Sequence, residues 1–302
     1  MIDLKIKIAS LNLKNPTILA SGVMDEDAGS MERIFNSGAS AIVTKSIGLK
    51  PRKGYPNPTV IELEHGILNA LGLPNPGIDE FKNEIIKLKK LKIPVFGSIF
   101  GSDYKEFVEL ATRMQKHGVD ALELNLSCPH AKGYGLEIGC DPDLVKEITS
   151  EVKKSTKIPV FVKISPNLTN IIEVAKSAED GNADGIVAIN TLKAMKIDLD
   201  MKMPVLSNKI GGYSGNAIKP IGIRCVYEIS QNINIPIIGV GGITTGLDAI
   251  EYLMAGASAV QIGSGIYYRG LDVFKKICDE IEIWMKEHGY NNLSKLIGVA
   301  HK

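Results

Sequence analysis

The segment "ELNLSCPH", residues 123–130, starts like a buried strand and ends in groups that can do chemistry. Cys128 and His130 place a thiol and an imidazole on either side of Pro129, which stops the strand. An ordinary thiol has a pKa of about 8.5, so a small fraction is thiolate at neutral pH and can accept a proton. The alternative role for Cys128 is that of a small buried hydrophobic residue. Its polar neighbours favour a general base.

Two lysines, Lys45 and Lys163, fall at the ends of predicted strands, where an unpaired ammonium would be costly. We therefore expect each to meet an anion or a polarised carbonyl. The carboxamides of Asn69, Asn125 and Asn190 suit a planar ligand with several carbonyl and imide groups. A competing interpretation makes Lys163 a Schiff-base lysine.

Glycine pairs close two late strand-like runs, in "GVGGI" (239–243) and "QIGSG" (261–265). Glycine lets backbone amides approach a ligand closely, and a following helix N-terminus favours an anion. Tight turns alone would explain either pair. Together they predict a phosphate site at Gly241, Gly242, Gly263 and Ser264.

Metal chemistry is not indicated. The five histidines are scattered, and no carboxylate–histidine cluster falls at a strand end. The four cysteines form no CxxC motif, so neither zinc nor an iron–sulfur cluster is expected on this chain. Cys225 and Cys278 occupy apolar positions of predicted helices and are expected in the core. A redox role for Cys140 stays open.

The elements that position these groups are eight apolar runs, alternating with segments of helical periodicity such as 79–91 and 103–118. Continuous apolar runs are typical of parallel strands buried on both faces. The pattern predicts a single-domain α/β fold over residues 1–302, a (β/α)8 TIM barrel closed below by a β extension at residues 1–15. An open doubly wound sheet is the alternative, but no GxGxxG follows the first strand. The expected strands are 17–22, 41–46, 94–100, 121–127, 159–165, 185–190, 236–242 and 259–264.

The charge and hydrophobicity of the sequence limit the kinds of molecule that the protein is expected to bind. The 302 residues carry 35 basic and 34 acidic side chains, a net charge of +1 that gives no general attraction to nucleic acid or anionic lipid. There is neither an apolar run long enough to span a membrane nor a signal-peptide pattern, so we expect a cytoplasmic protein without nucleic acid or membrane partners.

Eight motifs, in order at the predicted strand ends, resemble those of the dihydroorotate dehydrogenases, flavin-dependent barrel enzymes of pyrimidine biosynthesis. The resemblance is more specifically to the catalytic subunit of the NAD-linked class, class 1B, and it spans almost the whole chain. The motifs are "VTKS" (43–46), "NALGLPNPG" (69–77), "LNLSCPHAKGYGLEIG" (124–139), "FVKISPN" (161–167), "INT" (189–191), "GGYSGNAIKPI" (211–221), "GVGGI" (239–243) and "QIGS" (261–264).

The resemblance implies a role for each matching residue. Cys128 would remove the C5 proton of dihydroorotate while hydride leaves C6 for N5 of FMN. The substrate would be held by Lys45, Asn69, Ala70, Leu71, Gly72, Leu73, Asn125, Asn190 and Thr191. FMN would contact Ser21, Lys45, Ser46, Ser98, Asn125, Lys163, Ile189, Gly215, Gly241, Gly242, Gly263 and Ser264. Residues 129–140, after the fourth strand, would form a lid over the substrate.

The same resemblance implies partner molecules, and it leaves open alternatives for the electron acceptor and for the substrate. Electrons would pass to NAD through a partner subunit carrying FAD and an iron–sulfur cluster, in a heterotetramer with a homodimeric core. The other soluble class reduces fumarate without a partner. His130 stands where most members have asparagine, and the same "CPH" occurs in dihydropyrimidine dehydrogenases, which reduce uracil. A Schiff-base lyase using Lys163 and a flavin tRNA-modifying barrel are more remote alternatives.

Overall fold

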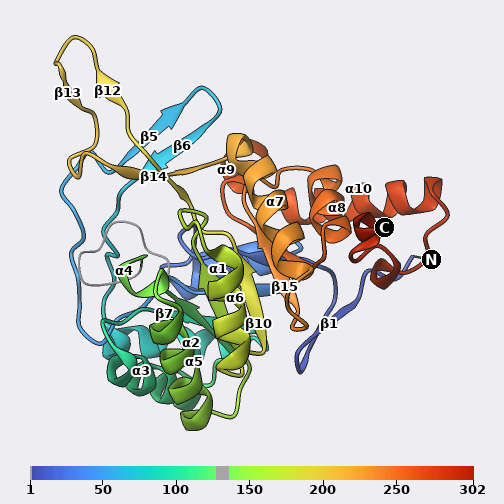
Figure 1. The fold of residues 1–302 in the computed structure, drawn as a ribbon, viewed down its shortest axis with the longest axis horizontal. Helices are drawn as coiled ribbons and strands as arrows, with labels where there is room; N and C mark the ends of the chain where they lie inside the picture. Colours follow the sequence, from blue (N-terminus) through green and yellow to red (C-terminus); the bar gives the residue numbers. More distant parts are fainter. Residues whose placement is uncertain (1, 127–135) are drawn as a thin grey trace.

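The computed structural model describes residues 2–126 and 136–302. Eight parallel strands, in chain order, close into a barrel, as predicted (Figure 1). Each lies within two residues of, or inside, its expected range. The strands are β3 (Thr17–Leu19), β4 (Ala41–Val43), β7 (Val95–Ile99), β8 (Ala121–Asn125), β9 (Val160–Ile164), β10 (Gly185–Ala188), β15 (Ile237–Val240) and β16 (Ala257–Ile262).

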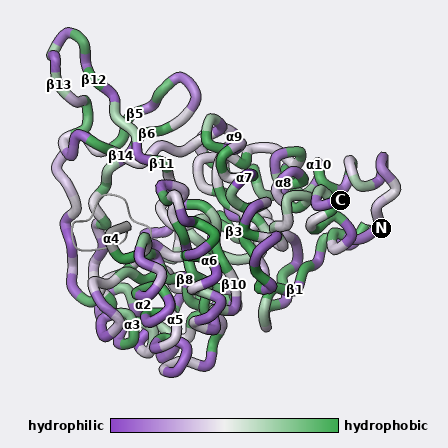
Figure 2. Tube along the Cα trace, in the orientation of Figure 1, coloured by the Kyte–Doolittle hydropathy of each residue, from purple (hydrophilic) through white to green (hydrophobic). Residues whose placement is uncertain are grey.

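Helices surround this barrel, and Figure 2 shows hydrophobic and hydrophilic residues alternating along them, as expected of helices with one face on the core. The helices predicted at 79–91 and 103–118 are α2 and α3, and each of their ends lies one residue from the predicted one. Asp103 caps α3, and its carboxylate accepts hydrogen bonds from two backbone amides of the first turn. The helices are α1 (Ala28–Asn36), α2 (Ile78–Lys90), α3 (Tyr104–His117), α4 (Leu136–Gly139), α5 (Pro142–Ser155), α6 (Ile171–Asp180), α7 (Lys219–Ser230), α8 (Gly246–Met254), α9 (Gly265–Arg269) and α10 (Val273–Glu287).

The predicted β extension is an antiparallel hairpin of β1 (Ile6–Ile8) and β2 (Leu11–Leu13). Ile8 and Leu13 are buried and pack against inward-facing strand residues such as Phe96 and Phe161. The hairpin therefore closes the bottom of the barrel with apolar side chains, and the lower half of the interior is a packed core.

Aspartates fasten helices to the lower ends of two strands. The Oδ2 atom of Asp184, just before β10, accepts hydrogen bonds from Val160 N at 2.7 Å and Lys153 Nζ at 2.5 Å. Asp120, just before β8, bonds in the same way to β7 and α2. Each carboxylate satisfies a strand amide and joins a helix to the barrel.

Two connections at the top of the barrel carry strands that periodicity did not predict. One contributes β5 (Val60–Leu63) and β6 (Gly66–Asn69), and the other β11 (Leu192–Ala194) and β14 (Gly211–Ser214). They form one antiparallel sheet in the order β11-β14-β6-β5, which stands above the barrel in Figure 1. A further hairpin, β12 (Ile197–Asp198) with β13 (Met203–Pro204), projects beyond it.

Cys225 and Cys278, expected in the core, do belong to it. Cys225 is fully buried in α7 and Cys278 packs partly buried in α10. Burial raises the pKa of each thiol to about 11, which makes both poor nucleophiles at neutral pH. Cys140 is exposed.

Within the described residues no helix is both long and apolar enough to cross a membrane. Nor do these residues contain a group of three or more His, Cys, Asp or Glu side chains arranged to hold a metal ion.

Candidate active site

A cavity of about 400 Å³ opens at the carboxyl ends of the barrel strands, beneath the antiparallel sheet. This is the end of a barrel where ligands bind. Most of the residues expected to hold substrate or cofactor line it. They are Ser21, Lys45, Ser46, Asn69, Leu71, Gly72, Leu73, Asn125, Lys163, Ile189, Asn190, Thr191, Gly241, Gly242, Gly263 and Ser264.

Three expected residues do not line the cavity. Ala70 is buried against Leu68 and Leu206, inside the small core of the upper sheet. Ser98 lies behind Ser46, with their hydroxyl oxygens 2.9 Å apart. Gly215 directly follows a lining residue, at the base of the loop that leads to α7.

The catalytic residue expected at Cys128 lies outside the described residues, as does most of the predicted lid. The described part of the strand before it ends at Asn125 and Leu126. Asn125 Nδ2 donates to Ser46 Oγ at 2.9 Å, so Asn125 is oriented at the cavity wall by the hydroxyl pair of Ser46 and Ser98.

Lys45 enters the cavity from the end of β4 with its side chain only 11% exposed. Its Nζ lies 2.8 Å from Glu26 Oε1, and the Glu26 side chain is 72% exposed. Beneath them Asp25 is buried, and its Oδ2 accepts a hydrogen bond from Gly22 N at 2.5 Å. Burial raises the pKa of the Asp25 carboxyl to about 6, and the hydrogen bond and the Lys45 charge only partly oppose that rise.

Lys163 forms part of the cavity floor. Its Nζ lies 3.2 Å from Glu123 Oε1, and Glu123 Oε2 accepts a hydrogen bond from Gln261 Nε2 at 2.8 Å. All three side chains are buried in the barrel interior, above the apolar layers. The ion pair gives the Lys163 ammonium the anion that its burial requires. A Schiff-base role would need a neutral amine there.

The loop after β15 carries the two glycines expected at a phosphate. Both have positive φ, 126° for Gly241 and 68° for Gly242. A Cβ at Gly242 would lie 2.7 Å from the carbonyl oxygen of Gly215, so only glycine fits. At Gly263 an added Cβ would make only ordinary van der Waals contacts, with Ala20 at 3.5 Å and Val23 at 3.9 Å, so a methyl group fits at the end of β16.

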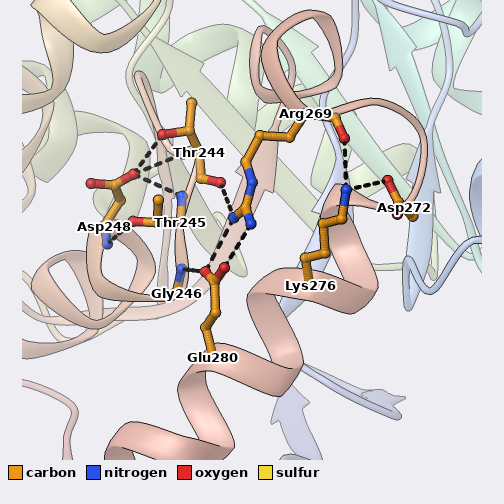
Figure 3. Close-up of polar contacts among 8 residues, drawn as sticks. All are labelled: Thr244, Thr245, Gly246, Asp248, Arg269, Asp272, Lys276 and Glu280. Carbon is orange, nitrogen blue, oxygen red and sulfur yellow. Dashed lines mark hydrogen bonds and ion pairs between the residues drawn. The ribbon is translucent and has the colours of Figure 1, made fainter.

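A polar network braces the segment that follows these glycines (Figure 3). Asp248 and Thr245 form a capping box at the start of α8, and Asp248 Oδ2 also accepts from Thr244 N and Oγ1. Arg269, at the end of α9, donates to Thr244 O at 2.9 Å and forms an ion pair with Glu280. The loop after β15 is thereby tied to three helices.

Two cavity residues, Gln261 and Tyr267, and two buried acids near the cavity, Glu123 and Asp25, were not predicted from the sequence. Gln261 and Tyr267 line the cavity, and the Tyr267 hydroxyl donates to Glu62 Oε2 at 2.7 Å, across to β5. A charged residue inside the apolar run "ALELNLS" was the available signal for Glu123. No local signal marked Asp25.

The residues present fit a flavin mononucleotide. A glycine-lined end suits a phosphate, and Lys163 supplies a buried cation beside the apolar lining of Val240 and Ile189. Within the described residues, the buried Oε1 atom of Gln261 has no hydrogen-bond partner, as expected of an atom that meets a ligand.

The fold and the cavity define a barrel protein with a ligand-sized cavity at the carboxyl ends of its strands. Residues 3–285 match the dihydroorotate dehydrogenase family, and the chain belongs to that family. It is 54% identical to a protein of Methanocaldococcus jannaschii over 99% of this chain and 98% of that one. It is 52% identical to a protein of Thermoplasma acidophilum over 99% of each chain. A protein of Pyrococcus horikoshii is 51% identical, over 99% of this chain and 98% of its own. All three are named dihydroorotate dehydrogenase B (NAD(+)), catalytic subunit.

Proposed function

We propose that this protein oxidises dihydroorotate to orotate in pyrimidine biosynthesis, as the catalytic subunit of an NAD-linked dihydroorotate dehydrogenase. The observation that carries the proposal is that family membership over nearly the whole chain coincides with a cavity lined by most of the family's expected binding residues. Bound FMN would supply the acceptor for the hydride that leaves C6 of the substrate.

The chain's own residues bind and orient the reactants. Lys45 carries a positive charge in a mostly enclosed setting, which suits the substrate carboxylate, and Asn69 and Asn190 offer amide groups to the substrate's ring. Cys128, identified from its motif, would accept the C5 proton as general base. Because a thiolate is needed, the rate of reduction by substrate should rise as pH approaches the thiol pKa.

The remaining cavity residues would hold the cofactor. Lys163 would lie against it from the floor, and Ser21, Ser46, Asn125 and Ile189 along the wall. Gly241, Gly242, Gly263 and Ser264 would receive its phosphate, with Gly215, whose carbonyl oxygen lies close to Gly242, beside them. The cavity volume of about 400 Å³ is of the order expected for a cofactor pocket.

We further propose a partner subunit that carries FAD and an iron–sulfur cluster and passes electrons to NAD, around a homodimer of this chain. The relatives' names, which specify a catalytic subunit, support a separate partner. Exposed apolar side chains on the β12–β13 hairpin, among them Leu199 and Met201, support burial in an assembly. Co-expression with a candidate partner and measurement of the mass of the complex test this.

The activity is tested by adding dihydroorotate anaerobically to the FMN-loaded chain and following the flavin absorbance. We expect bleaching in the wild type, a loss of at least a hundredfold in its rate in Cys128→Ala, and no comparable loss in Cys140→Ala, the matched cysteine control. A yellow protein that is not reduced by dihydroorotate but, once reduced, is reoxidised by uracil would show that the substrate is a dihydropyrimidine instead of dihydroorotate. A chain that takes up no FMN would contradict the proposal.

A further inference from the structure

A buried carboxylate lies directly below the cavity, at Glu123. It has no exposed surface and does not line the cavity, whereas Lys163 and Gln261, the residues it contacts, both do. Each carboxylate oxygen of Glu123 contacts one of these two residues. Oε1 lies 3.2 Å from Lys163 Nζ, and Oε2 lies 2.8 Å from Gln261 Nε2. Any group on the floor of the cavity therefore meets two side chains that Glu123 holds.

The hydrogen bond to Gln261 spans the barrel. Glu123 is on β8 and Gln261 on β16, and four steps separate these strands in either direction around the closed sheet. The two residues are 138 positions apart in the sequence. This link can form only when the barrel is closed, and it places a charged layer between the apolar interior and the cavity.

The chemistry of the carboxylate fixes the orientation of the Gln261 amide. An ionised carboxylate only accepts hydrogen bonds, so Gln261 must turn its NH2 group toward Glu123. Its Oε1 then points elsewhere, and among the described residues it is a buried acceptor with no partner. The floor thus offers one acceptor, from Gln261, beside one donor, from Lys163. A flavin, with N–H, carbonyl and hydroxyl groups, matches such a pair.

The charge of the floor follows from the same contacts. Glu123 and Lys163 carry opposite charges in a setting with almost no solvent, where the effective dielectric is low and charge effects are strong. The pair is neutral overall, so the positive charge that Lys163 presents to a bound cofactor is largely offset by the carboxylate beneath it.

We propose that Glu123 is a positioning residue for the cofactor: it holds Lys163 and Gln261 as a donor and acceptor pair and keeps the cavity floor electrically neutral. This inference rests on the proposed function, because it takes FMN to be the ligand. Positive charge close to a flavin favours its reduced form, which is richer in electrons. Glu123 therefore lowers the reduction potential of the bound cofactor.

The test compares the midpoint potential of FMN bound to the wild type and to Glu123→Gln, measured by dye-coupled anaerobic reduction. Glutamine keeps the shape and removes the negative charge. We expect the ratio of affinities for reduced and oxidised FMN to rise at least tenfold, which corresponds to about 30 mV for a two-electron couple. Glu123→Asp, which keeps the charge, should stay within threefold of the wild type. Asp184→Asn, which removes a charge at the opposite end of the barrel, should leave the ratio unchanged.

A second variant keeps the inference testable if Glu123→Gln does not fold. Gln261→Met keeps the volume and the ion pair but removes the amide, so we expect at least tenfold weaker FMN binding with an unchanged potential. The inference is overturned if Glu123→Gln leaves the potential unmoved, if Glu123→Asp shifts it equally, or if Gln261→Met binds FMN as tightly as the wild type. A wild-type chain that binds no FMN contradicts the proposed function itself.

Discussion

Asp25 allows a quantitative prediction of stability, because burial of its charged carboxylate lowers the free energy of unfolding. The side chain is 1% exposed and accepts a hydrogen bond from Gly22 N, which an asparagine Oδ1 can also accept. Asp25→Asn therefore removes the buried charge and keeps the hydrogen bond. We expect this variant to be more stable than the wild type at neutral pH.

The magnitude follows from the pKa. Burial raises the pKa of Asp25 from 3.8 to about 6, so the folded state binds more protons than the unfolded state between those values. Wild-type stability consequently falls as pH rises through this window, and the loss is complete above pH 6. A shift of about two pKa units corresponds to about 3 kcal/mol at pH 8, whereas at pH 4 the difference shrinks to about 0.5 kcal/mol.

The assay is urea unfolding of the wild type and Asp25→Asn at pH 4, 6 and 8, with the difference between the two proteins followed against pH. The neighbouring Asp27→Asn is the matched control. Hydrogen bonds from Ser30 lower the pKa of Asp27, so removing that charge should give no gain as pH rises. If Asp25→Asn gained no stability between pH 4 and pH 8, the carboxylate would not be buried at a cost and the reasoning would be wrong.

Three further substitutions test the packing of α7 and two parts of the site. Gly222→Ala should destabilise the protein by about 1–3 kcal/mol in urea unfolding despite alanine's better helix propensity, because the new Cβ would lie 1.9 Å from the Tyr252 hydroxyl. Gly263→Ala should unfold at the wild-type urea concentration but bind FMN at least tenfold more weakly by fluorescence titration, since its methyl group fits the backbone and enters the cavity. Glu26→Gln should lower KM for dihydroorotate severalfold with kcat unchanged, because the Glu26 carboxylate at 2.8 Å competes with the substrate for Lys45; an unchanged KM would exclude that competition.

The barrel was predictable because its signal is local. Each parallel strand is covered on both faces, so runs such as "PVFVKIS" are apolar throughout and stand out between helices. The antiparallel sheet was missed because its strands are short and lie inside connections. The alternation in "VIELEHGILN" (60–69), with a turn at Glu64 and His65, was the available signal for β5 and β6.

Much of the cavity lining was also predictable from the sequence. Polar residues at the ends of parallel strands come together at one end of a closed barrel, and Lys45, Asn125 and Lys163 do line one cavity. The contact between Glu123 and Gln261 could not be foreseen, because only the closed barrel joins strands on its opposite sides. The burial of Asp25 depends on a turn whose shape no periodicity specifies.

The pairing of β16 with β3 has a consequence for how the protein is made. These strands, at residues 257–262 and 17–19, form a seam that closes only after almost all of the chain between them has been synthesised. Gly263 and Ser264, which we propose receive the phosphate, follow that seam strand, so a nascent chain that already has Lys45 and Lys163 still lacks part of the proposed phosphate site. Cofactor loading is therefore expected to follow synthesis, and a ribosome stalled before residue 257 would hold a chain that cannot retain FMN.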